Sequence, residues 1–198
     1  MSKELNILIL NASMLGTSYF FSKKVLTQII AEKEQQGFEN ISVKEMDLNE
    51  ELKGELLVSS NLATYTEDMD KYLNLFKDND IIICATSLIN YHASPAMVAL
   101  LNKIIINGVT FQYGENGPEA ILTSEFADKQ VYVVATSGSP HHYLPSGPAT
   151  AFQSVTQSFE FIGLSSKLIY ADGTNAPENF GKSPEELAEV FSDTLANI

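Results

Sequence analysis

The chain has 198 residues, 44% of them hydrophobic, which is enough to build a full core in one domain spanning residues 1–198. Its formal net charge is −13, and all twelve of its basic residues are lysines. This balance argues against nucleic acid and against an anionic membrane as partners, and it leaves phosphate to lysines, hydroxyls or backbone N–H groups. Because Cys84 is the single cysteine, in an apolar run, and no signal peptide or membrane span is evident, we expect an inert buried thiol in a cytoplasmic protein.

The first half of the chain alternates between short apolar runs and amphipathic stretches. Residues 7–10 predict a buried strand, and a helix begins near Ser18 and stops at Gly37. Residues 41–46 predict a second strand, and Thr64 or Thr66 is expected to cap the next helix. A buried strand at 81–85 follows, and then a helix in which Pro95 occupies the first turn after Ser94.

The second half continues this alternation after an excursion. Residues 108–128 combine strand-like alternation with turn residues at 114–118, and they are longer than a simple connection requires. Strands are predicted at 131–135 and 164–170, with a helix at 149–162 between them. Ser183-Pro184-Glu185-Glu186 is typical of the start of a last helix.

Five strands that alternate with helices predict an α/β fold in which a parallel sheet has helices on both faces. We therefore expect a flavodoxin-like three-layer sandwich with strand order 2-1-3-4-5. In such a sheet a ligand lies at the carboxyl ends of the strands. The loops 11–18, 86–95 and 136–148 meet there, and all three are rich in hydroxyls and small residues.

The first of these loops is a candidate phosphate site. The hydroxyls of Ser13 and Ser18 and the N–H groups of Tyr19 and Phe20 can hold a monophosphate at the positive end of the helix dipole. The alternative is an ordinary strand-to-helix turn with a serine cap, and this stretch alone does not decide between the two.

The other two loops can line a flavin ring, which needs apolar contact on one face and backbone groups along its polar edge. In the second loop, apolar contact comes from Leu88 and Ile89, and backbone groups come from neighbouring residues. In the third loop, small residues allow the backbone to approach the pyrimidine end. The candidate ring contacts are Ser87, Leu88, Ile89, Asn90, Tyr91, Ser137, Gly138 and Ser139.

The three histidines are weaker candidates for a functional role. His141 and His142 are adjacent on a loop with no acidic partner at ligand spacing, so they are expected to face solvent, and we assign neither a metal nor a catalytic base. His92, next to the Asn-Tyr pair, can line the edge of the ring.

The string GVTFQYGENGPEA at 108–120 makes a family resemblance specific. Together with the three loops, it is similar to the FMN-dependent NADH:quinone oxidoreductases, also called FMN-dependent NADH-azoreductases. The resemblance implies a flavodoxin-like homodimer that binds FMN and carries two electrons from NAD(P)H, with NADH as the expected donor, to quinone or azo acceptors by a ping-pong mechanism. By analogy with that family, Tyr113 and Phe161 reach the acceptor pocket, although packing in the core or at an interface explains them equally well.

Carried over by position, Ser13 and Ser18 match the phosphate serines of this family, and Asn90 is the only identity in its ring loop. The chain also lacks the Arg that the family often has in the loop after the fourth strand. Three alternatives remain open: a one-electron flavodoxin-like carrier, a non-catalytic module that binds FMN or another small molecule, and a serine hydrolase. The hydrolase is the weakest, because no Gly-x-Ser-x-Gly motif is present.

Overall fold

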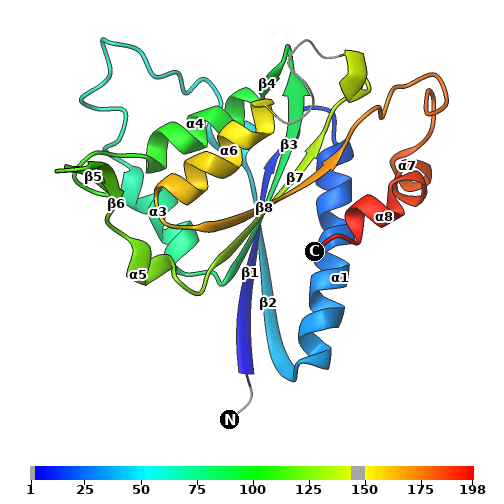
Figure 1. The fold of residues 1–198 in the computed structure, drawn as a ribbon, viewed down its shortest axis with the longest axis horizontal. Helices are drawn as coiled ribbons and strands as arrows, with labels where there is room; N and C mark the ends of the chain where they lie inside the picture. Colours follow the sequence, from blue (N-terminus) through cyan, green and yellow to red (C-terminus); the bar gives the residue numbers. More distant parts are fainter. Residues whose placement is uncertain (1–2, 144–149) are drawn as a thin grey trace.

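Five parallel strands in the order β2-β1-β3-β7-β8 form the centre of the protein, between two layers of helices (Figure 1). The computed structural model describes residues 3–143 and 150–198. The strands are β1 (Lys3–Ala12), β2 (Phe38–Asp47), β3 (Ile81–Ile89), β7 (Gln130–Thr136) and β8 (Ser165–Ala171). The predicted order 2-1-3-4-5 is therefore confirmed.

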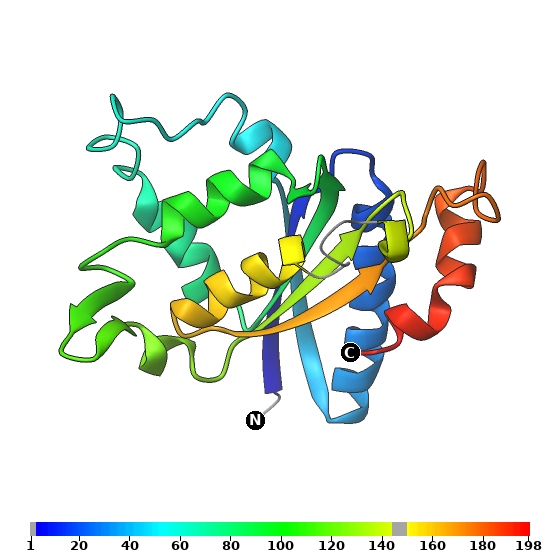
Figure 2. The ribbon, with the colours of Figure 1, turned by 45° about the horizontal axis from the view of Figure 1, so that its top comes forward.

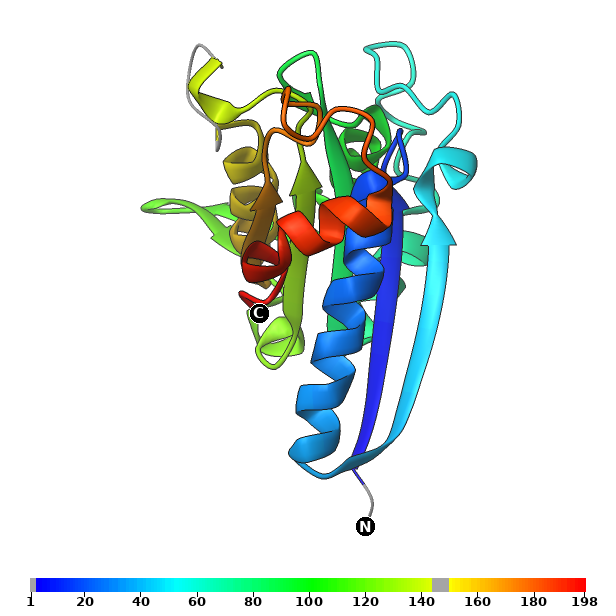
Figure 3. The same ribbon diagram turned by 90° about the vertical axis from the view of Figure 1, so that its right-hand side faces the viewer.

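One face of the sheet is covered by α1 (Thr17–Gln35), α7 (Pro184–Val190) and α8 (Ser192–Leu195), which Figure 3 shows in front of the strands. Phe21 and Val25 of α1 are fully buried against Ile7 of β1. Ser183 caps α7 in a reciprocal capping box with Glu186, as the sequence predicts. The expected single last helix is instead two short helices that meet at Phe191.

The other face is covered by α2 (Leu48–Glu51), α3 (Met69–Lys77), α4 (Pro95–Ile104), α5 (Thr123–Phe126) and α6 (Thr150–Phe161). Ser94 caps α4 and Pro95 follows it, as predicted. The predicted cap of α3 is wrong: the helix begins after Asp68, because Thr64 and Thr66 lie in turns that precede it.

Two hairpins interrupt the alternation. After β3 the chain reverses at once into β4 (His92–Ala93), which pairs with it antiparallel. The excursion forms a second hairpin, β5 (Phe111–Gly114) with β6 (Gly117–Ala120), which projects from the flank of the molecule in Figures 1 and 3. Its strands share no pairing with the main sheet.

The carboxyl ends of β1, β3, β7 and β8 lie at one edge, which Figure 2 turns toward the viewer. The loops after these strands converge at that edge, as does the short helix η1 (His141–Tyr143). None of the helices in the described part of the chain is both long and apolar enough to cross a membrane.

Candidate active site

Three serine hydroxyls meet at the carboxyl edge beneath the start of α1. The Ser87 Oγ of β3 lies 3.3 Å from the Ser13 Oγ and 3.2 Å from the Ser18 Oγ, and all three residues are buried. Ser13 also accepts a hydrogen bond of 3.1 Å from the Gly16 N–H. We call Ser13, Ser18 and Ser87 the hydroxyl cluster. The two serines predicted to hold phosphate therefore lie together, and a third comes from the next strand.

The start of α1 adds backbone donors to this cluster. Gly16 is the N-cap, in the left-handed conformation at φ 81°, and no side chain caps the helix. The alternative of a serine cap on α1 is therefore wrong: Ser13 accepts from the Gly16 N–H in the loop before the helix, and the hydroxyls of Ser13 and Ser18 both contact Ser87. A Cβ added to Gly16 would meet no atom within 4 Å, so a ligand can approach the loop backbone there. Uncharged donors at an open helix start are a set that suits a phosphate monoester.

Tyr19 and Phe20 differ in what their N–H groups can do. The Phe20 N–H donates to the Gly16 carbonyl at 2.9 Å and is thus already part of the helix. Tyr19 lies one residue earlier, in the first turn, where an N–H has no acceptor within the helix. Its side chain turns away from the cluster, and its hydroxyl donates to Glu45 of β2.

Charge near Tyr19 is neutralised locally. Lys23 pairs with the same Glu45 carboxylate. The hydrogen bond from Lys23, and after it the one from Tyr19, holds the pKa of Glu45 below its usual value. This carboxylate is therefore engaged in its own ion pair beside the start of α1.

The predicted ring loop at 87–91 is mostly strand. Ser87, Leu88 and Ile89 belong to β3, and only Asn90 and Tyr91 form the turn to β4. Both turn residues have positive φ, 49° and 67°, which is the backbone of a type I′ hairpin. The prediction of a loop was wrong because the polar sequence concealed this tight pairing. Its consequence is that Ser87 joins the hydroxyl cluster, while the turn stands at the edge with Tyr91 57% exposed.

The loop after β7 is bound to the end of β8. The Ser137 hydroxyl lies 2.6 Å from the Tyr170 hydroxyl and donates to the Ser139 carbonyl. The Ser137 carbonyl accepts from both the N–H and the hydroxyl of Thr174. The side chain of Ser137 is thus structural, and what this loop offers to a ligand is the backbone around Gly138 and Ser139.

His141 has an acidic partner that the sequence analysis missed. Its Nδ1 and its backbone N–H lie 2.5 Å and 2.8 Å from the same oxygen of Asp172. Burial alone would raise the pKa of Asp172, but these hydrogen bonds outweigh it and hold the pKa below its usual value. The signal available in the sequence was position, because Asp172 directly follows the fifth strand and so reaches this edge.

Asn49 is a second residue that the sequence analysis missed. Its side-chain amide donates to the carbonyls of Asn11 and Ser13 at 3.3 and 3.2 Å, so it holds the loop that carries the hydroxyl cluster. It comes two residues after the end of β2, and the same rule of position identifies it.

Other chemistry is less favoured. Cys84 is fully buried, and burial raises the pKa of its thiol, as expected for an inert cysteine. Across residues 3–143 and 150–198, no group of three His, Cys, Asp or Glu side chains could hold a metal ion.

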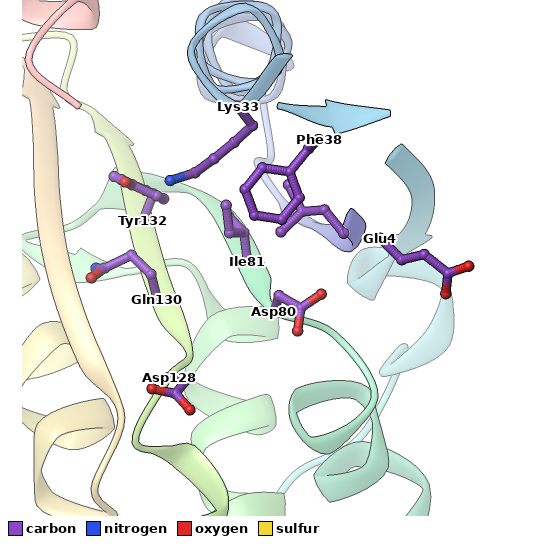
Figure 4. Close-up of a pocket in the computed structure, with 9 residues that line it drawn as sticks. Glu4, Lys33, Phe38, Asp80, Ile81, Asp128, Gln130 and Tyr132 are labelled. Carbon is purple, nitrogen blue, oxygen red and sulfur yellow. The ribbon is translucent and has the colours of Figure 1, made fainter. Parts of the chain in front are cut away.

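A cavity of about 380 Å³ lies at the opposite edge, among the amino ends of the strands (Figure 4). Figure 4 shows the Lys33 amino group directed toward Tyr132, with Phe38 beside it and the carboxylates of Asp80 and Asp128 below. This cavity shares no residue with the hydroxyl cluster, so the two places can be tested independently.

Large apolar side chains are exposed around the carboxyl edge. They come from the loops after β1, β3 and β8, from the segment between α2 and α3, and from η1: Met14, Leu15, Leu56, Val58, Leu62, Tyr91, Tyr143 and Phe180. Exposed apolar side chains gathered at one edge are typical of a binding site or an interface. Buried hydroxyl donors with an apolar rim suit a ligand that has a phosphate at one end and a flat ring at the other.

Comparison with known proteins agrees with this fold. The family model described as the flavodoxin-like fold matches residues 5–195. The FMN-dependent NADH:quinone oxidoreductase of Malacoplasma penetrans is 28% identical over 96% of this chain and 89% of its own length. The protein of the same name from Escherichia coli O157:H7 is 27% identical over 97% and 96%.

Among solved structures, azoreductase AzrA matches with a TM-score of 0.65 at 20% identity, over 98% of this chain and all of its own. An FMN-dependent NADH-azoreductase from Bacillus anthracis, solved in complex with FMN, matches with a TM-score of 0.61 at 21% identity over the whole of both chains. These two likenesses support the fold.

Proposed function

Because this chain belongs to the family of the flavodoxin-like fold, we propose that it is an FMN-dependent oxidoreductase that passes two electrons from NADH to quinone or azo acceptors. Relatives similar over nearly the whole chain carry the name FMN-dependent NADH:quinone oxidoreductase. The structural observation that supports the proposal most is the hydroxyl cluster at the start of α1, where β1 and β3 deliver donors to one place.

We assign the FMN phosphate to Ser13, Ser18, Ser87 and the Tyr19 N–H. The Phe20 N–H is left out of this assignment because it bonds Gly16. The residues that would then contact the ring lie along the carboxyl edge: the Asn90–Tyr91 turn, the backbone of Gly138 and Ser139, and Leu88 and Ile89. When bound, FMN supplies the two-electron chemistry, and the protein supplies position and electrostatics.

The donor and the acceptor use the same face of the site in turn in this proposal, which predicts ping-pong kinetics. The protein has no arginine with which to grip a 2′-phosphate, so NADH is favoured over NADPH. Initial rates measured at several NADH concentrations, with the acceptor varied, should give parallel double-reciprocal lines.

We further propose a homodimer. The β5–β6 hairpin has no sheet partner within the described chain, and a two-stranded hairpin alone is marginally stable. Tyr113 near its tip is 73% exposed, and the centres of the Phe111 and Phe161 rings are 4.9 Å apart, with the rings tilted by 50°. A second copy would cover these aromatic side chains.

The test begins with visible spectra of the purified protein, titrated with FMN and separately with riboflavin. We expect FMN to bind and to be preferred over riboflavin, because only FMN carries the phosphate. Anaerobic NADH should then bleach the bound flavin, and menadione should restore its colour with steady turnover. Bleaching without steady turnover would favour an electron carrier, and a protein that ignores FMN would overturn the proposal.

A further inference from the structure

Lys103 of α4 is a buried lysine outside the site described above. Its side chain is 4% exposed, and its Nζ lies 2.7 Å from the Tyr65 carbonyl, 2.8 Å from Asp68 Oδ1 and 3.2 Å from Glu55 Oε2. It also lies 4.3 Å from the centre of the Tyr65 ring. Burial alone would lower the pKa of Lys103, but the two carboxylates outweigh it and raise the pKa above its usual value. The amine is therefore a charged anchor.

This amine links the two ends of a long irregular segment. Residues 55–68 contain no helix or strand, yet both ends of the segment bond the same amino group. Loops of this length without secondary structure are uncommon unless they serve a function. Figures 1 and 2 show the segment standing beyond α4 at the carboxyl edge. Without Lys103, the bonds that tie Glu55 and Asp68 to α4 would be lost.

The anchored segment forms part of a cavity next to the hydroxyl cluster. The cavity has a volume of about 500 Å³, and Glu55 and Leu56 line it together with Pro95 and Ala96 from the first turn of α4. Met14, adjacent to Ser13 in the loop after β1, lines it too. Leu52 adds to this apolar lining, and the polar side chains on the wall are those of Asn49, Lys53 and Glu55. The apolar part of the cavity suits an uncharged ring.

We infer that Lys103 is a positioning residue, which sets the cavity wall against which the apolar ring of the electron acceptor is placed. This inference rests on the proposed oxidoreductase function. The lysine itself lines neither the cavity nor the hydroxyl cluster. It acts through Glu55, whose side chain contacts both the lysine and the cavity.

The first test needs no activity, because it follows the segment in the FMN-free protein. Trypsin can reach the Lys53 side chain, which is exposed and lies next to the segment. Cleavage between Lys53 and Gly54 also needs the backbone around them to open locally, so its rate reports that opening. We expect Lys103→Met to speed this cleavage by about tenfold. Asp68→Asn should speed it by about threefold, because one of the two carboxylates remains. Asn is also well tolerated at the N-cap of α3 that Asp68 occupies, so this variant should fold.

Lys129→Met is the matched control. Its amine, like that of Lys103, is held by backbone oxygen, here the carbonyls of Lys77 and Asn79 at 2.7 and 3.0 Å, but it lies at the opposite edge of the sheet. We expect Lys129→Met to leave the cleavage rate at Lys53 unchanged.

The second test is kinetic. In Asp68→Asn and Lys103→Met, the KM for menadione should rise by about fivefold while kcat stays within about twofold and the FMN affinity is unchanged. Equal cleavage rates in wild type and Asp68→Asn, or the same shifts in Lys129→Met, would overturn the inference. If cleavage changes as expected but the wild type does not turn over quinones, Lys103 still holds the segment in place, but both the proposed function and the role of Lys103 toward the acceptor are wrong.

Discussion

At the scale of single residues, the proposed phosphate site consists of neutral donors. A phosphate is commonly gripped by the forked guanidinium of arginine, which this chain lacks. Here three neutral hydroxyls lie beneath a helix start, and those of Ser13 and Ser18 are 3.3 Å and 3.2 Å from that of Ser87, their common partner. In the phosphate site that we propose, recognition would depend on the position of each hydroxyl, because no arginine charge compensates for a misplaced donor.

Ser87→Ala tests this dependence. Removing the central hydroxyl should weaken the binding of FMN about tenfold, which is roughly 1.4 kcal/mol. The affinity for riboflavin should change little, because riboflavin has no phosphate. The preference for FMN over riboflavin, measured by fluorescence titration, is therefore the readout.

Ser22→Ala is the control for the loss of a buried hydroxyl. Ser22 is also buried and lies on α1, one turn after Ser18, but its hydroxyl donates to the Tyr19 carbonyl. It should keep the FMN preference. The phosphate assignment fails if Ser87→Ala keeps the full preference for FMN.

The His141–Asp172 pair makes a prediction about pH and stability. A carboxylate whose pKa is lowered in the folded state stabilises the protein above its unfolded pKa, and this contribution is lost as the pH falls through the folded value. Asp172→Asn should therefore cost about 1–2 kcal/mol of unfolding free energy at pH 7. The difference from wild type should shrink as the pH drops below about 4. Urea denaturation of wild type and Asp172→Asn, from pH 7 to below about 4, measures this difference in unfolding free energy. A difference that does not vary with pH would contradict the pairing.

At the scale of elements, the hairpin of β3 and β4 stands out because it places a tyrosine where glycine is preferred. Tyr91 has φ 67°, and its side chain is exposed at the edge of the candidate site. The left-handed conformation costs a non-glycine residue about 1–2 kcal/mol. A strained residue that keeps a large exposed side chain beside a ligand site points to a functional reason for that side chain.

Tyr91→Gly should relieve this strain. After the greater entropy of glycine in the unfolded chain is subtracted, we expect a gain of about 0.5–1 kcal/mol in unfolding free energy. If Tyr91 contacts the ring, FMN should bind more weakly even though the fold is more stable. Asn90→Gly is the comparison, and it should gain less, because asparagine tolerates this conformation better. A destabilised Tyr91→Gly would show that the tyrosine side chain packs within the fold.

At the scale of the whole molecule, the sequence predicts the architecture better than the site. The apolar runs at 7–10, 81–85 and 131–135 all lie within buried parallel strands, because strands covered on both faces leave this clear pattern. The order of the sheet follows from the alternation of strands and helices and is confirmed.

The site was only partly predictable, because its contacts join distant parts of the chain. Ser87 was expected beside the flavin ring, and its contact with Ser13 depends on the pairing of β1 with β3. The partnership of His141 with Asp172 depends in the same way on the pairing of β7 with β8. Local patterns place a residue at an edge of the sheet, but only the register of the strands decides which residues touch.

The projecting β5–β6 hairpin carries the last prediction. Its two short strands bury little, and its aromatic side chains contact mainly one another and Phe161, with Phe111 and Tyr113 rings 5.7 Å apart. If a second copy covers them, Tyr113→Asp places a charge inside an apolar interface and should weaken the dimer at least tenfold, which is roughly 1.4 kcal/mol or more. Light scattering coupled to size exclusion, over a range of concentrations, measures the change.

Val190→Asp is the matched substitution for this experiment, since Val190 is a half-exposed apolar residue of α7 on the other face of the sheet. It should leave the dimer intact. Because the proposed interface is on the β5–β6 hairpin and the hydroxyl cluster lies at the carboxyl edge, Tyr113→Asp also separates assembly from cofactor binding. FMN should still bind the monomer through its phosphate, whereas a wild type that is monomeric at every concentration would remove the dimer from the proposal and leave the phosphate site untouched.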